Sequence, residues 1–162
     1  MLVVQGNLAN SYEMLGRFEA ALRLMRDVYS GRLRLNGEEY EETLRAAYSY
    51  AVSLNGLQRF KEAKALMRKM MPVARRVLGE NHDITLSMRS IYANVLFADP
   101  GATLDDLREA LTTLEDAERI ARRMLGGAHP DTVGIENDLR HARAALRARE
   151  TKRYKLLQGQ LP

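Results

Sequence analysis

The chain of 162 residues contains no cysteine and no tryptophan, and only four prolines. The absence of cysteine excludes disulfides and thiolate metal sites. No apolar run approaches the roughly 20 residues that a membrane-spanning helix requires, and residues 1–15 lack the pattern of a signal peptide. Valine, isoleucine, threonine and aromatic residues are sparse beside alanine, leucine, arginine and glutamate, a balance that favours helix over strand. We therefore expect a soluble, helical protein of the cytoplasm.

Charge is unevenly placed along the chain. Residues 1–132 carry 18 basic and 18 acidic side chains, whereas residues 133–162 carry 7 basic and 3 acidic ones. The body of the chain is thus electrically balanced, and the net charge of +4 belongs to its C-terminal end.

An internal repeat is the strongest signal in the sequence, because many residues recur at one spacing. The first step is 42 residues and the second is 47, with five additional residues accounted for by the turn-forming segment Asp99–Thr103. The matched positions include Phe18 and Phe60; Ala21, Ala63 and Ala110; Gly37, Gly79 and Gly126; His82 and His129; and Thr43, Thr85 and Thr132.

Each repeat has the pattern of two helices. We expect repeats over about 1–42, 43–84 and 85–131, a capping helix over 132–157 and a short tail over 158–162. Thr103 and Asp106 have the spacing of a capping box, and the glycine after each long second helix suits a left-handed C-terminal position. Pro72 predicts a kink, or a break near Met70–Met71. The expected helices cover about 2–15, 18–35, 43–56, 60–78, 85–98, 104–125 and 133–157.

The segment Asn7–Leu24 resembles the tetratricopeptide signature, with Leu8, Ala9, Tyr12, Gly16, Phe18 and Ala21 at its positions. The linkers Leu78–Asp83 and Leu125–Thr132 resemble those of kinesin-light-chain-type repeats. Gln58, Asp83 and the insertion depart from the pattern. This resemblance implies an all-α fold, a right-handed α-α superhelix of about three helix pairs plus a C-terminal capping helix, forming one solenoid over 1–157. It also implies an adaptor or scaffold that binds a peptide segment of a partner protein.

In such arrays the first helix of each pair lines the concave groove. Asparagine suits a peptide-binding groove because its amide both donates and accepts hydrogen bonds. Arg45 offers a place for an acidic residue of the partner. A carboxylate clamp uses paired Lys and Asn, and because the groove offers only Arg45 and Arg89 as cations, that specialised use is disfavoured. The expected groove residues are Asn7, Asn10, Arg45, Tyr48, Ser49, Asn55, Ser90, Asn94, Asn137 and His141.

Other functions find little support. No nucleophile motif, phosphate-binding loop or carboxylate pair indicates an enzyme, a cofactor or a small-molecule substrate. His82 and His129 recur without a third ligand, so capping or packing of the next helix is favoured over metal binding. Arg140, Arg143 and Arg147 form a basic surface that could bind nucleic acid, but a solvated capping helix is favoured. A structural role stays an alternative, in which exposed end repeats stack on another copy or on the rest of a longer repeat array. The apolar edge formed by Leu2, Val3 and Val4 supports it.

Overall fold

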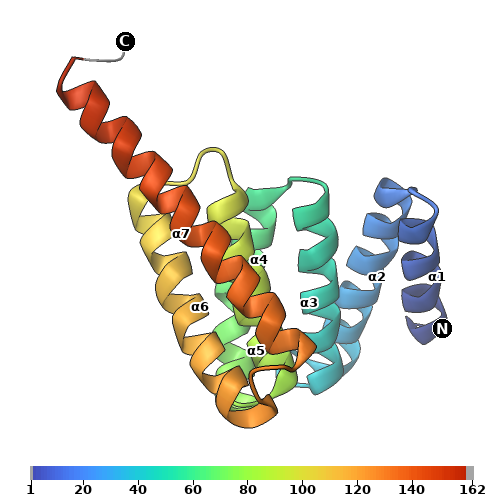
Figure 1. Ribbon diagram of the computed structural model, residues 1–162. Helices are drawn as coiled ribbons and strands as arrows, with labels where there is room; N and C mark the ends of the chain where they lie inside the picture. Colours follow the sequence, from blue (N-terminus) through green and yellow to red (C-terminus); the bar gives the residue numbers. More distant parts are fainter. Residues whose placement is uncertain (1, 160–162) are drawn as a thin grey trace. The chain divides into compact units, whose positions relative to one another are not determined.

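The computed structural model describes residues 2–159, and every regular element within that range is a helix (Figure 1). The fold is all-α, which confirms the predicted fold class. Predicted and observed helix ends differ by three residues or fewer, the largest shift being the earlier start of the last helix at Pro130. The helices are α1 (Leu2–Met14), α2 (Phe18–Asn36), α3 (Glu41–Gly56), α4 (Phe60–Val77), α5 (Asp83–Ala98), α6 (Leu104–Leu125) and α7 (Pro130–Leu157).

The chain forms two compact bodies whose boundary lies within α5. The N-terminal body comprises residues 1–92 and contains α1 to α4 with the first part of α5. The C-terminal body comprises residues 93–162 and contains the rest of α5 with α6 and α7. A single solenoid over residues 1–157 stays a prediction.

Small side chains let the helices of the N-terminal body approach closely. Ala9 on α1 and Ala21 on α2 have no exposed surface, and together with Met25 they form a small core. Tyr12, Leu24 and Tyr50 pack around this core, so that α3 contacts the pair formed by α1 and α2. The recurrence of alanine in the repeats indicated this arrangement, in which alanines lie at the contact between α1 and α2 and larger residues surround them.

Glycines end the long second helices where the sequence predicted them. Gly37, Gly79 and Gly126 have φ angles of 80°, 90° and 87°, a region in which a side chain causes strain. The short turn between the first two helices uses the same conformation at Gly16, with a φ of 72°. Forty-two residues later Gln58 adopts a φ of 58°, and it is the one described residue other than glycine with a positive φ.

The predicted break near Met70–Met71 is wrong, whereas the alternative, a kink at Pro72, stays a prediction. Helix α4 continues through Pro72 from Phe60 to Val77. Pro72 is exposed, whereas Met70, two residues before it, and Val73, directly after it, are buried. Because proline has no backbone N–H, the carbonyl four residues before Pro72 lacks its helical hydrogen bond, and water can reach it on this exposed side. The buried flanking side chains keep the helix packed against its neighbours.

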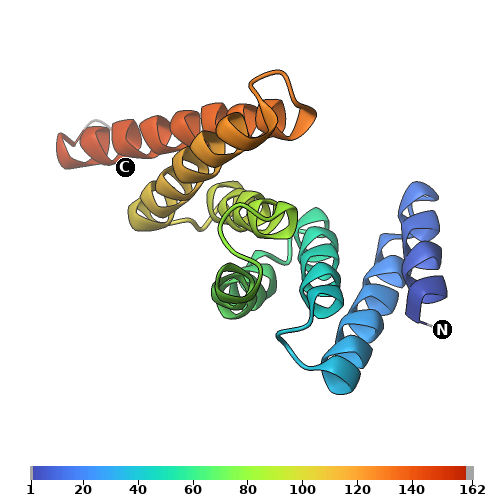
Figure 2. The ribbon, with the colours of Figure 1, turned by 90° about the horizontal axis from the view of Figure 1, so that it is seen from below.

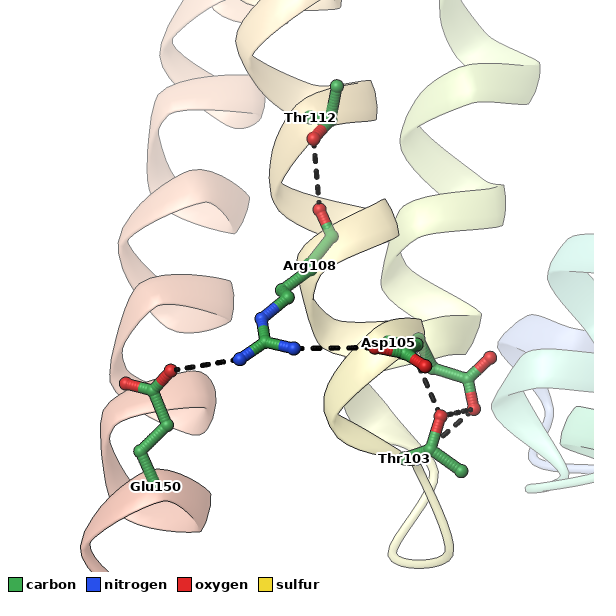
Figure 3. A network of polar contacts seen from close by, with 6 residues as sticks. Thr103, Asp105, Arg108, Thr112 and Glu150 are labelled. Atoms are coloured by element: carbon green, nitrogen blue, oxygen red, sulfur yellow. Dashed lines mark hydrogen bonds and ion pairs between the residues drawn. The ribbon is translucent and has the colours of Figure 1, made fainter.

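Polar contacts fix α6 against α7 in the C-terminal body (Figure 3). The predicted capping box is present, since the Asp106 amide donates to Thr103 Oγ1 and the Thr103 amide donates to Asp106 Oδ2, both at 3.1 Å. One turn further, Arg108 pairs with Asp105 at 3.3 Å and with Glu150 of α7 at 3.7 Å. Beyond Glu150 every described residue of α7 is exposed, and its last turns extend past α6 (Figures 1 and 2).

Candidate binding surface

An open pocket of about 230 Å³ lies between the first three helices of the N-terminal body. Four predicted groove residues, Asn7, Asn10, Arg45 and Ser49, meet in its lining. The repeat pattern along the first helices therefore predicted four side chains that lie together in the folded chain. The complete lining is Gly6, Asn7 and Asn10 from α1, Met25, Val28 and Arg32 from α2, and Glu42, Arg45, Ala46 and Ser49 from α3.

The pocket combines apolar and polar surface. Met25, Val28 and Ala46 are buried side chains that supply apolar contact. Asn7 and Asn10 are exposed, so their amides are available to a ligand. Such a mixture suits an extended peptide, whose backbone needs hydrogen-bonding partners while its side chains need apolar contacts.

The charged side chains of the pocket are largely paired within the protein. Arg32 lies 3.6 Å from Glu42, and Arg45 lies 3.0 Å from Glu41 one turn earlier on α3. The sequence prediction missed Arg32 and the apolar wall of α2 because it considered first helices alone, and it missed Glu42 because the expected helix began at residue 43, whereas α3 begins at Glu41. The pairing also reduces the positive charge that Arg45 offers to an acidic partner residue, although a guanidinium retains further donors.

The other predicted residues of the N-terminal body do not line this pocket. Tyr48, Asn55 and Ser90 are half-buried on α3 and α5. Their contribution to binding stays a prediction.

A second polar cluster lies in the C-terminal body, around Asp138 of α7. Asn94 of α5 makes a side-chain hydrogen bond to the Asp138 carboxyl, and His141 lies near enough to interact with it electrostatically. Burial raises the pKa of Asp138, while His141 and the Asn94 hydrogen bond act in the opposite direction. Two predicted residues thus meet at a carboxyl group that the sequence did not indicate. Asp138 corresponds to the apolar Ile91 one repeat earlier, so the repeat itself gave no signal.

The predicted basic surface is partly neutralised. Arg143 pairs with Glu115 of α6 at 3.2 Å, and Arg140 donates to Asn137, the remaining predicted groove residue. Arg147 is exposed. Two of the three arginines are therefore held by neighbouring side chains.

The recurring linker histidines cap helices. His82 Nδ1 accepts a hydrogen bond from the Ile84 amide at 3.3 Å, and His129 Nδ1 accepts one from the Asp131 amide at 3.2 Å. This confirms the capping role expected from their repetition. Within residues 2–159, no three His, Cys, Asp or Glu side chains lie together as a metal site would require. None of the described helices is long and apolar enough to cross a bilayer.

Comparison with known proteins defines the class of this fold. Residues 1–69 match the family model of the tetratricopeptide repeat. Among curated proteins, none matches the chain in sequence.

Solved structures extend the likeness over nearly the whole chain. TPR-like repeats from a protein of Podosopora anserina, described as a kinesin light chain, match 98% of this chain and 72% of that chain. The TM-score is 0.80 at 21% identity, and a variant of the same protein gives 0.81. The protein BtubC (BKLC) from P. vanneervenii gives a TM-score of 0.67 at 16% identity, over 99% of this chain and 66% of that one. The fold is therefore that of kinesin-light-chain tetratricopeptide repeats, as the sequence motifs indicated.

Proposed function

We propose that the protein is a protein–protein interaction module, an adaptor or scaffold of the cytoplasm, which binds an extended peptide segment of a partner. The observation that carries this proposal is the pocket of the N-terminal body, where Asn7, Asn10, Arg45 and Ser49 surround apolar surface from α2. Tetratricopeptide folds serve protein partners as a class, and a binding role rather than catalysis fits a surface with no nucleophile and base in contact.

The peptide segment that fits this pocket has a specified chemistry. Its backbone would exchange hydrogen bonds with the Asn7 and Asn10 amides, which lie three residues apart on one face of α1. An apolar side chain would contact Met25 and Val28. A strongly acidic segment is not required, because Glu41 and Glu42 already pair with the two arginines at the pocket.

Peptides selected from a random displayed library on the immobilised chain provide the test. Each lost hydrogen bond weakens binding by about 1 kcal/mol, so replacing both Asn7 and Asn10 by alanine should raise Kd about 30-fold in fluorescence anisotropy. Asn36→Ala is the matched control, because Asn36 is an exposed asparagine at the end of α2, outside the pocket.

The outcomes separate clearly. Weakened binding in the double variant alone supports the pocket as the peptide site. Selected peptides that bind the double variant and the wild type equally would contradict the assignment, and so would a library that yields no binder.

A further inference from the structure

The polar cluster around Asp138 occupies the same repeat positions as the pocket of the N-terminal body, with altered chemistry. Asn10 of α1 and Ser49 of α3 line that pocket. The residues two repeats later are Asn94 of α5 and Asp138 of α7, which are joined by a side-chain hydrogen bond. A carboxyl group in the C-terminal body therefore replaces the serine hydroxyl of the pocket.

The positive charges of the pocket have no counterpart in the C-terminal body. Arg32 and Arg45 line the pocket of the N-terminal body. Their equivalents two repeats later are Ala121 of α6 and Gly134 of α7. At these positions the C-terminal body thus loses two cations and gains the anion of Asp138. A ligand would meet negative rather than positive charge there.

The Asp138 carboxyl is half-buried, and no lysine or arginine within residues 2–159 interacts with it. Burial has the largest effect on its pKa and raises it, because the carboxylate charge is incompletely solvated. Asn94 and His141 lower the pKa, so the hydrogen bond from the Asn94 amide stabilises the charged form. A cation that pairs with this carboxylate would replace the solvation that burial removes.

The basic side chains of α7 itself are directed elsewhere. The three arginines of the predicted basic surface lie about 140–200° around the helix from Asp138, which places them on its opposite side. Arg149 lies on the same side as Asp138 but about three turns further along, and its guanidinium donates to the Pro100 carbonyl at 3.0 Å. The Asp138 carboxyl is therefore left to a cation from another molecule.

We propose that Asp138, oriented by Asn94, binds a lysine or arginine side chain of a partner protein. This inference rests on the proposed role as an interaction module, but it does not depend on peptide binding in the N-terminal pocket. An ammonium or guanidinium group donates several hydrogen bonds, and its apolar stem can lie along the helix while the charged end reaches the carboxylate. Because Asp138 is half-buried, such a pair is screened less by water than a pair on the open surface.

A random displayed peptide library, selected in parallel on the immobilised wild type and on Asp138→Asn, tests this site. The substitution keeps the shape of the side chain and removes its charge, and circular dichroism checks that the fold is retained. We expect a class of peptides with a recurring lysine or arginine to be recovered on the wild type and lost on the variant. In fluorescence anisotropy, a labelled peptide of this class should bind Asp138→Asn about 10-fold more weakly than the wild type.

A double-mutant cycle identifies the pair directly. Replacing the recurring basic residue of the peptide by glutamine should weaken binding to the wild type about 10-fold, and should add little when Asp138 is already asparagine. Asp116→Asn is the matched control, because Asp116 is also half-buried and undergoes the same charge change, but it already pairs with Arg119 of its own helix. This control should bind the peptide like the wild type.

The outcomes distinguish this site from the N-terminal pocket. The variant with both Asn7 and Asn10 replaced by alanine should bind the basic peptide with unchanged Kd. Equal recovery of basic peptides on the wild type and on Asp138→Asn would overturn the inference, and so would fully additive effects in the cycle. A peptide whose binding depends on Asn7 and Asn10 but not on Asp138 would support the pocket and overturn this site, whereas a library without any binder would contradict both.

Discussion

Replacement of Gln58 by glycine tests the repeat argument at a single backbone position. Gln58 occupies the turn between α3 and α4 with a φ of 58°, in the place where the first repeat has Gly16 with a φ of 72°. The turn is fixed by hydrogen bonds from the Gln58 amide to the Asn55 carbonyl at 2.9 Å and from the Arg59 amide to the Leu54 carbonyl at 2.8 Å. Gln58 therefore holds a left-handed conformation that the surrounding structure imposes.

The size of the effect follows from two opposing contributions. A left-handed conformation costs a residue with a side chain about 1–2 kcal/mol, and glycine avoids most of this. Glycine also gives the unfolded chain more freedom, which offsets about 0.4–1 kcal/mol of the gain. We expect Gln58→Gly to raise the free energy of unfolding by about 0.5–1 kcal/mol. For a chain of this length the melting temperature should rise by about 1–4 °C.

Thermal unfolding followed by circular dichroism measures this change. Gln58→Ala is the control, because it removes the same exposed side chain while keeping the backbone restriction, and its melting temperature should stay near that of the wild type. The converse variant Gly16→Ala should melt at a lower temperature. If Gln58→Gly melted at or below the temperature of Gln58→Ala, the strain assigned to this turn would be absent and the reasoning refuted.

Two further predictions concern the C-terminal body. Thr103→Ala removes the hydroxyl that accepts a hydrogen bond from the Asp106 amide, so it should lower the free energy of unfolding by about 1 kcal/mol in thermal melts. Thr112→Ala, on the exposed side of the same helix, is the control and should have a smaller effect. Equal effects of the two variants would contradict the capping role. The raised pKa of Asp138 means that its protonated form favours folding, so its contribution is present below the unfolded value near 3.8 and is lost as pH rises through the folded pKa. The melting temperature of Asp138→Asn should therefore increase relative to that of the wild type as the pH rises. A difference between the two melting temperatures that stays constant with pH would contradict the burial of this carboxyl.

The repeat made much of the fold predictable, because helix ends depend on local chemistry. Thr103 with Asp106 marked the start of α6, and Gly126 marked its end, both as observed. Pro72 shows the limit of such local reasoning. The rule that proline breaks a helix considers the isolated segment, whereas the burial of Met70 and Val73 keeps α4 continuous.

The candidate site was predictable only in part. Spacing along first helices identified Asn7, Asn10, Arg45 and Ser49, because a repeated pattern places equivalent residues on equivalent faces. Arg32 of α2 also lines the pocket, but it lies on a second helix, where no groove position was expected. Its pairing with Glu42 depends on how α2 packs against α3, and the spacing of residues in one chain does not encode that distance.

The sequence by itself determined the helices, their order and the likeness to a tetratricopeptide-type fold, because periodicity, caps and turn residues act over a few positions of the chain. Tertiary structure alone decided which charges are neutralised and which apolar side chains stay exposed. Leu8 and Tyr92 occupy equivalent positions in their repeats, yet Leu8 is 42% exposed and Tyr92 is 2% exposed. The difference arises because exposure depends on the neighbouring helix that covers a residue, and equivalent positions in two repeats need not have equivalent neighbours.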